Sequence, residues 1–294
     1  TFGRTRLILT VHSLLGVERD RRRVLYFRLF ARFADRIVAV SPWLKDRIAA
    51  LGVDPARVEV VPNGATFPER LPLGPSARRA LRRELSPGLP VALVEARWLL
   101  CLGRIHPGKG QELVLRVWEA LPPSCRNRLA LFFVGQPNAP EHLERLRRLA
   151  LDAAGAARIV IAPPSDRPQD WLAASDIFIS ASSYEAMPLA PLEAAGSGLP
   201  AVLSDIEGHR FLRGRALYFD AAKPEEGARR VAEAVAAIDR AGDREHAEAA
   251  WREAEPLRRR WGSRAMTSSY IDIFQSVHKS SAAAAEGRPK LGGI

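Results

Sequence analysis

Two acidic residues, Glu185 and Glu193, mark the part of the sequence whose residues are best suited to binding or catalysis. Seven residues separate them, the apolar run 177–179 precedes the first, and the second lies in residues 189–195, which we expect to form a short helix. Where a strand leads into a helix, the first helical amides are unpaired and attract anions. Carboxylates beside such a site need neutral donors. We therefore expect them to accept hydrogen bonds from hydroxyl groups, such as those of a sugar.

A second segment, GRIHPGKG at residues 103–110, carries two cations between an expected strand and an expected helix. Ligands of open α/β sheets lie beyond the carboxyl ends of the strands, so Arg104 and Lys109 should project toward such a ligand. A guanidinium and an ammonium can neutralise a departing diphosphate, while Gly103 lets the backbone approach it. The spacing is not that of a Walker loop. Taken alone, the segment could also be a solvated basic turn.

The elements that must position these segments alternate along the chain. Strands are expected at residues 97–102, 129–134, 158–162, 176–180 and 201–203, with helices between them. An earlier and smaller set has strands at residues 6–11, 37–40 and 58–61, with helices at 21–36 and 42–51. Such alternation predicts two α/β units built on parallel sheets.

Composition limits the remaining classes. The chain has 294 residues, 47% of them hydrophobic, and no apolar run long enough to span a membrane. Two cysteines are too few for a disulfide framework, and no Cys/His spacing indicates zinc, so we expect no metal site and a cytoplasmic setting. The first residues lack the apolar core of a secretory signal.

The net charge of +11 is concentrated near the start of the chain. Residues 1–36 hold nine arginines against three acidic residues, which points to an anionic partner, although an arginine-rich composition would give the same excess. Within residues 19–36, arginines alternate with Tyr26, Phe27 and Phe30, as in helices that lie on anionic membranes. The alternative is an ordinary helix packed on a sheet. No nucleic-acid partner is expected, because no helix-turn-helix or stacking pattern occurs.

Together the two segments resemble the family 4 retaining glycosyltransferases, which have the GT-B fold. The resemblance rests on Gly-Arg-x4-Lys-Gly at residues 103–110, Glu-x7-Glu at 185–193 and Gly-x-Pro at 198–200. It extends to Val11-His12, Val40-Ser41 with Lys45, the Pro62-Asn63-Gly64 turn and Asp176.

The resemblance implies two Rossmann-like domains with parallel sheets, of which the N-terminal one is incomplete. Residues 1–65 would form part of the acceptor-side domain and residues 66–262 the nucleotide-sugar domain. Residues 263–279 would be a helix that returns to the N-terminal domain, and residues 280–294 a disordered tail.

The resemblance also implies roles for individual residues. Arg104 and Lys109 would hold the donor diphosphate, Glu193 the ribose hydroxyls, and Glu185 the transferred sugar. His12 would lie near the hydroxyls of that sugar, although a histidine ending an apolar strand is by itself more often structural. The expected donor-binding set is completed by Gly103, Ala186, Met187, Pro188 and Leu189. Ala186 departs from the family pattern, which commonly has glycine there.

The function implied is retaining transfer of a sugar from a UDP- or GDP-sugar to the hydroxyl of a glycan or lipid-linked acceptor. Neither a cofactor nor a metal ion is expected, since no Asp-x-Asp motif occurs. The setting would be bacterial cell-surface polysaccharide, lipopolysaccharide or glycolipid synthesis, with the protein peripheral at the inner face of the cell membrane. The alternative is a catalytically inactive nucleotide-sugar-binding fragment or partner subunit.

Overall fold

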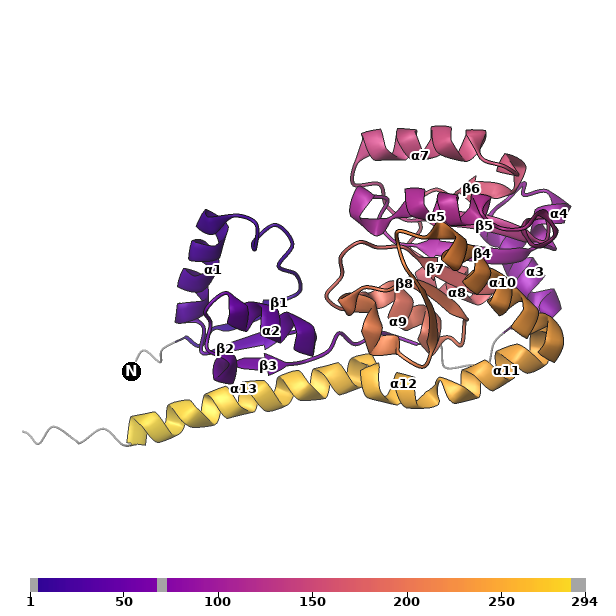
Figure 1. The fold of residues 1–294 in the computed structure, drawn as a ribbon. Coiled ribbons are helices and arrows are strands. Elements are labelled where there is room, and N and C mark those ends of the chain that lie inside the picture. The colour runs from indigo at the N-terminus through magenta and orange to yellow at the C-terminus, as the bar shows by residue number, and fades with distance from the viewer. Residues whose placement is uncertain (1–4, 68–72, 287–294) are drawn as a thin grey trace, which may run out of the picture. The chain divides into compact units, whose positions relative to one another are not determined.

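The computed structural model describes residues 5–67 and 73–286, which divide into two compact units. Unit 1 comprises residues 1–64 and 261–294, and unit 2 comprises residues 65–260 (Figure 1). In both units the described strands pair in parallel, which confirms the expected α/β fold class.

Unit 1 contains a three-stranded sheet in the order β1-β2-β3. Its helix α2 (Pro42–Ala50) begins where the sequence predicts, because the hydroxyl of Ser41 accepts a hydrogen bond from the amide of Leu44 at 3.2 Å. The other elements of its first part are β1 (Ile8–Val11), α1 (Arg21–Phe33), β2 (Arg36–Ala39), η1 (Pro55–Arg57) and β3 (Val58–Val60).

The long helix α13 (Ser263–Glu286) packs on the sheet of unit 1. Ile273 and Val277 are buried against Val38 of β2, and the Tyr270 hydroxyl lies 3.2 Å from that of Thr10. The expected disordered tail from residue 280 is wrong as far as Glu286. The four alanines there are strong helix formers and extend the helix. Residues 287–294 lie outside the described residues.

Unit 2 contains a six-stranded parallel sheet in the order β6-β5-β4-β7-β8-β9. The chain adds β5 and then β6 on one side of β4, returns to place β7 on the other side, and continues through β8 to β9. The strands are β4 (Arg97–Leu102), β5 (Leu129–Val134), β6 (Ile159–Ile161), β7 (Ile177–Ser180), β8 (Ala201–Ser204) and β9 (Ala216–Phe219).

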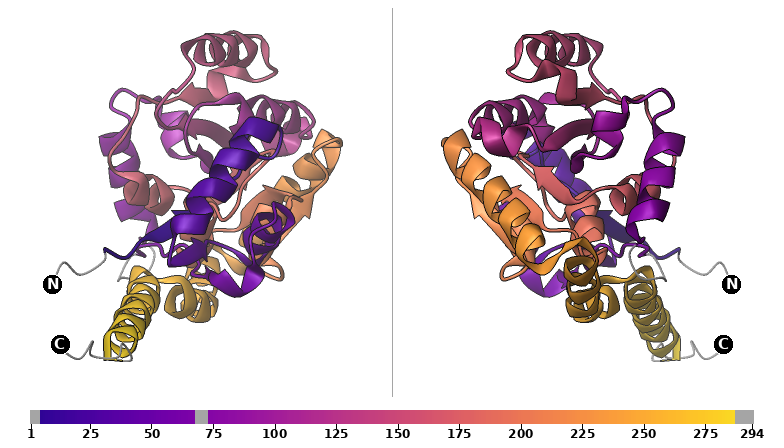
Figure 2. Two further views of the ribbon diagram at one scale, coloured as in Figure 1. Left: turned by 90° about the vertical axis from the view of Figure 1, so that its left-hand side faces the viewer. Right: turned by 90° about the vertical axis from the view of Figure 1, so that its right-hand side faces the viewer.

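Helices cover both faces of this sheet, as Figure 2 shows. Successive strand residues point to opposite faces, so Leu99 and Leu131 pack under α5, α7 and α10, while Trp98 stacks on Phe132 and Trp171 on the other face. The strands are therefore apolar on both sides, as parallel strands usually are. The helices before β9 are α3 (Pro75–Leu85), α4 (Val91–Val94), η2 (Pro107–Lys109), α5 (Gln111–Glu119), α6 (Pro123–Arg126), α7 (Pro140–Asp152), η3 (Ala156–Arg158), α8 (Pro168–Ala174), α9 (Leu189–Gly196) and η4 (Glu207–Leu212).

Three features differ from the sequence expectation. The region after Gly208 is ordered as η4 and β9, a short edge strand that only partly buries its side chains and so lacks a strong apolar signal. A short helix, α4, lies within residues 65–95, which their Pro- and Arg-rich sequence predicts to be irregular apart from one short helix near residues 77–85. The helices after β9 are α10 (Pro224–Ala241), α11 (Asp243–Glu253) and α12 (Glu255–Trp261). The last two take the place of the single helix that the sequence predicts over residues 244–260.

Candidate functional site

The two segments singled out by sequence meet at one edge of the sheet of unit 2. Residues 103–110 follow β4 and residues 181–188 follow β7, and these two strands are neighbours, with Leu99 opposite Ile177. Because the chain leaves β4 and β7 toward opposite sides of the sheet, their carboxyl ends form a topological switch point. Ligands of open α/β folds bind at such points.

The backbones of the two loops interlock. The amide of Ser183 donates a hydrogen bond to the carbonyl of Gly108 at 3.0 Å. Gly110 has a φ of +70°, and a Cβ placed there would lie 2.0 Å from the carbonyl oxygen of Ala181. Only glycine tolerates both the conformation and the close approach. The close packing of the two loops therefore requires glycine at position 110, next to Lys109.

Lys109 and Glu185 form the centre of the site. The ammonium of Lys109 lies 2.5 Å from Oε1 of Glu185, and the hydroxyl of Ser182 donates to the same oxygen at 2.9 Å. Both charged side chains are partly buried, which strengthens a charge-assisted hydrogen bond. The sequence predicted that these residues share one edge, but it did not predict that they contact one another.

Arg104 lies in the same loop as Lys109, and its side chain is exposed. Its backbone carbonyl accepts a hydrogen bond at 2.9 Å from the side chain of Gln111, which is buried at the start of α5. The loop is thus held from beneath while the guanidinium faces solvent. Gln111 was not predicted, because its burial and its contact with Arg104 are properties of the fold.

Helix α9 carries Glu193 in its second turn, where the side chain is half-buried. Burial raises the pKa of this carboxyl group above its usual value. Ala186, Met187 and Pro188 are buried before the helix, and Leu189 is exposed at its first position. Among the described contacts, none joins Glu193 to Lys109 or Glu185.

A further layer supports Glu185 from the loop after β8. The hydroxyl of Ser204 donates to the carbonyl of Ser182 at 2.7 Å, and Nδ1 of the buried His209 donates to the carbonyl of Ser204 at 2.8 Å. A Cβ on Gly208 would lie 2.0 Å from the carbonyl oxygen of Glu185. Burial lowers the pKa of His209, which keeps the ring neutral. No pattern in the sequence assigned a role to residues 206–210.

His12 follows β1 of unit 1 and is exposed. Gly103, the last residue of the donor-binding set, follows β4 directly and has a positive φ. No group of three or more His, Cys, Asp or Glu side chains in the described ranges is placed to hold a metal ion.

The site thus combines two cations, one hydrogen-bonded carboxylate, a half-buried carboxylate and a helix N-terminus on one sheet edge. Cations and unpaired amides stabilise negative charge that develops on a leaving group. Carboxylates can accept hydrogen bonds from several hydroxyl groups at once. The arrangement suits a ligand that has both an anionic part and a hydroxyl-rich part.

Two family descriptions match the chain. Residues 96–237 match Glycosyl transferases group 1, and residues 2–66 match Glycosyltransferase Family 4. Among curated relatives, a D-inositol 3-phosphate glycosyltransferase of Acidothermus cellulolyticus is 31% identical over 221 residues, covering 69% of this chain and 47% of the relative. The lipopolysaccharide core biosynthesis mannosyltransferase LpsB of Rhizobium meliloti is 32% identical over 109 residues, covering 36% and 30%. The chain spans about half the length of the first of these relatives.

Solved structures share the fold at low identity. Anabaena Alr3699/HepE in complex with UDP-glucose superposes with a TM-score of 0.76 at 18% identity, covering 92% of this chain and 72% of that protein. Sucrose-phosphate synthase from Thermosynechococcus elongatus gives a TM-score of 0.74 at 19% identity, covering 93% and 68%.

Proposed function

Because the chain belongs to the family 4 glycosyltransferases with the GT-B fold, we propose that it transfers a sugar from a nucleotide-sugar donor to an acceptor hydroxyl, with retention of configuration. The observation that carries the proposal is the Lys109–Glu185 pair at the switch point of unit 2. It places a cation for phosphate beside a carboxylate for sugar hydroxyls. The chain spans about half the length of its curated relative from Acidothermus cellulolyticus, so the activity stays a proposal.

In this proposal, Arg104 and Lys109 offset the charge that gathers on the diphosphate as the bond to the sugar breaks. The first amides of α9 face the same charge. Glu193 accepts hydrogen bonds from the ribose, and Glu185, with the backbone of residues 186–189, orients the transferred sugar. His12 is assigned to the sugar hydroxyls by family resemblance.

The donor proposed is a UDP-sugar, with a GDP-sugar as the second choice. The complex of HepE with UDP-glucose supports a UDP-sugar as the donor. Because LpsB is described as a mannosyltransferase, a donor with another nucleotide is retained as the second choice. A thermal-shift panel of UDP-, GDP- and ADP-sugars tests the assignment. A donor present at about a hundred times its Kd should stabilise the protein by about 2.7 kcal/mol. Equal melting temperatures with and without every donor would contradict donor binding.

We further propose that transfer needs no metal ion, since two cations and a helix N-terminus can supply the charge that a metal would supply. Turnover measured with purified protein in excess EDTA should equal turnover in added Mg²⁺ or Mn²⁺. A loss of activity in EDTA that Mg²⁺ restores would contradict this.

The acceptor is proposed to be a glycan or a lipid-linked sugar of the bacterial cell surface, reached from the inner face of the membrane. Helix α1 supports this location, because its exposed Leu25, Leu29 and Phe33 alternate with arginines such as Arg28. No helix in the described ranges is long and apolar enough to cross a bilayer. Flotation with vesicles containing anionic lipid should recover the protein, and neutral vesicles should not.

A second candidate is a nucleotide-sugar-binding partner subunit without turnover. A donor that shifts the melting temperature of this chain but is neither hydrolysed nor transferred would select this alternative.

A further inference from the structure

A second pocket of unit 2 lies at the opposite ends of the same strands. It has a volume of about 420 Å³. Its lining includes Arg97, the first residue of β4, and Asp176, the residue before β7. Neither Arg104, Lys109, Glu185 nor Glu193 lines it. The pocket is therefore separate from the site proposed for the donor, and we call it the amino-edge pocket.

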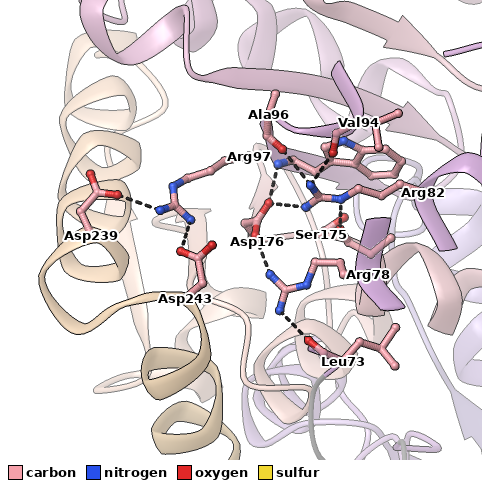
Figure 3. Close-up of polar contacts among 12 residues, drawn as sticks. Leu73, Arg78, Arg82, Val94, Ala96, Arg97, Ser175, Asp176, Asp239 and Asp243 are labelled. Carbon is pink, nitrogen blue, oxygen red and sulfur yellow. Dashed lines mark hydrogen bonds and ion pairs between the residues drawn. The ribbon is translucent and has the colours of Figure 1, made fainter. Parts of the chain in front are cut away.

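The wall of the amino-edge pocket is built on a buried carboxylate, shown in Figure 3. Asp176 accepts hydrogen bonds from Arg78 at 2.7 Å, from Arg82 at 2.6 Å and from the amide of Trp98 at 2.7 Å. Arg82 also donates to the carbonyls of Val94 and Ala96, so most of its donors are used within the protein. Arg82 and Asp176 form a rigid frame rather than a contact surface.

Arg78 differs from Arg82 in having donors to spare. One guanidinium nitrogen bonds Asp176, and a second is 3.5 Å from the carbonyl of Leu73. Its Nε is buried and has no hydrogen-bond partner among the described residues. A buried, unpaired donor on a charged group costs free energy.

Positive charge exceeds negative charge around the pocket. Seven arginines line it: Arg78, Arg79, Arg82, Arg97, Arg128, Arg158 and Arg244. Their carboxylate partners among the described residues number five: Asp176, Glu95, Asp243, Asp239 and Glu248. Two positive charges therefore remain without a counter-charge.

Two of these arginines are only weakly paired within the protein. Arg158 makes one described hydrogen bond, to the carbonyl of Leu129 at 3.3 Å, and no described carboxylate pairs with it. Arg79 reaches Glu95 only at 3.6 Å. Both guanidinium groups keep donors that a ligand could use.

We propose that the amino-edge pocket binds a phosphate monoester of a small molecule, or inorganic phosphate, as a dianion. Two negative charges match the excess of two positive charges, and the guanidinium fork matches phosphate oxygens in pairs. The volume lies in the range of small-molecule sites, and the ligand would be held between Arg78, Arg79 and Arg158. The concave shape favours a small anion over a polynucleotide.

The test is isothermal titration of the protein with glycerol 3-phosphate and with inorganic phosphate, with glycerol as the uncharged control. The variant R79Q/R158Q removes the two weakly paired cations without touching Asp176. We expect at least tenfold weaker binding of both phosphates by this variant. The control R229Q removes an exposed arginine of α10 that does not line the pocket, and should bind as the unchanged protein does.

Lys109→Ala serves as a second control, because a phosphate that binds at the proposed donor site would lose affinity in this variant. Unchanged affinity in Lys109→Ala together with lost affinity in R79Q/R158Q supports the proposal. Tighter binding of glycerol 3-phosphate than of inorganic phosphate identifies an ester as the ligand, and equal binding identifies phosphate itself.

Three results would overturn the proposal: no measurable heat with either phosphate, an equal loss in R229Q, or tighter pocket-dependent binding of an oligonucleotide. Each leaves the donor assignment intact, since that rests on the other end of the strands. Conversely, failure of every nucleotide sugar to bind would leave the amino-edge pocket unaffected.

Discussion

The two ends of the sheet in unit 2 use arginine, lysine and carboxylate groups in different ways. At the carboxyl edge, Lys109 and Glu185 form one partly exposed pair on loops. At the amino edge, Asp176 is buried and shared by Arg78 and Arg82, and Arg82 is further fixed by backbone carbonyls. Charged groups with many buried partners fix the strands, whereas those with few partners remain able to bind a ligand. Residue type alone therefore does not show whether a charged group fixes the strands or binds a ligand.

The largest effect expected from this comparison is on stability, from Arg82→Ala. Removing one partner of a buried ion pair typically costs about 3–5 kcal/mol. Here it leaves Asp176 with Arg78 as its remaining described cation and leaves the carbonyls of Val94 and Ala96 without their Arg82 donor. Chemical denaturation should show this loss. The matched control Arg83→Ala changes the exposed neighbour on α3 and should alter stability by about 0.5 kcal/mol or less. Equal effects of the two variants would show that the Asp176 frame is not structural.

At the carboxyl edge, the expected effect is on catalysis. Lys109→Ala and Arg104→Ala should each lower turnover by roughly a hundredfold or more, because each removes charge stabilisation from the departing diphosphate. Donor affinity should fall less than turnover, and the melting temperature should change little. Steady-state kinetics and a melting curve check both parts. Unchanged turnover in both variants would refute the assigned roles.

The packing of the loops predicts an intermediate effect for Gly110→Ala. The new Cβ would overlap the carbonyl of Ala181, and alanine resists the positive φ, so a loss of about 1–3 kcal/mol in unfolding free energy is expected. Gly108→Ala is the control, because a Cβ there meets only the ring of His106 at 3.3 Å. A smaller loss for Gly110→Ala than for Gly108→Ala would contradict this account.

The smallest effect concerns pH. Burial lowers the pKa of His209 in the folded protein below its ordinary value of 6.5, while Glu185 and Asp205 raise it and Lys109 lowers it further. The unfolded chain therefore binds the proton first, and stability falls as the pH drops below about 6.5, by at most about 1.4 kcal/mol per pH unit for one proton. Burial of His142 and His246 acts in the same direction.

His209→Gln should reduce the dependence of the unfolding free energy on pH between pH 7 and pH 5. Denaturation at each pH measures this dependence. An unchanged slope would mean that His209 is not the group that titrates. Glu193 has a raised pKa, so it contributes the opposite slope, at pH values nearer the ordinary carboxyl range.

Strands buried on both faces were the easiest elements to predict. The expected ranges 97–102 and 129–134 agree with β4 and β5, because continuous apolar runs of this length rarely form anything else between turns. The edge strand β9 was missed, since it is only partly buried. Local pattern therefore predicts the centre of the sheet better than its margin.

Of the candidate site, the sequence predicted which loops share an edge but not which side chains touch. Gln111, Ser182 and His209 bond groups only three to seven residues away, but the folded loops decide that these groups meet and are buried. A local sequence pattern does not reveal this. The amino-edge pocket was not predicted for the same reason. Its arginines come from α3, β4, η3, α11 and the residue before β5, and no single stretch contains the constellation.

The strand order of unit 2 also has a consequence for how the site is assembled in time. Lys109 and Glu185 are 76 residues apart, and β7 can join β4 only after the chain has passed through β5 and β6. Long-range parallel pairing is slow, because the entropy of closing a long loop is lost before the contact forms. The Lys109–Glu185 pair is thus expected among the last contacts to form during folding. A chain could contain a folded β4–β5–β6 layer while its ligand site did not yet exist.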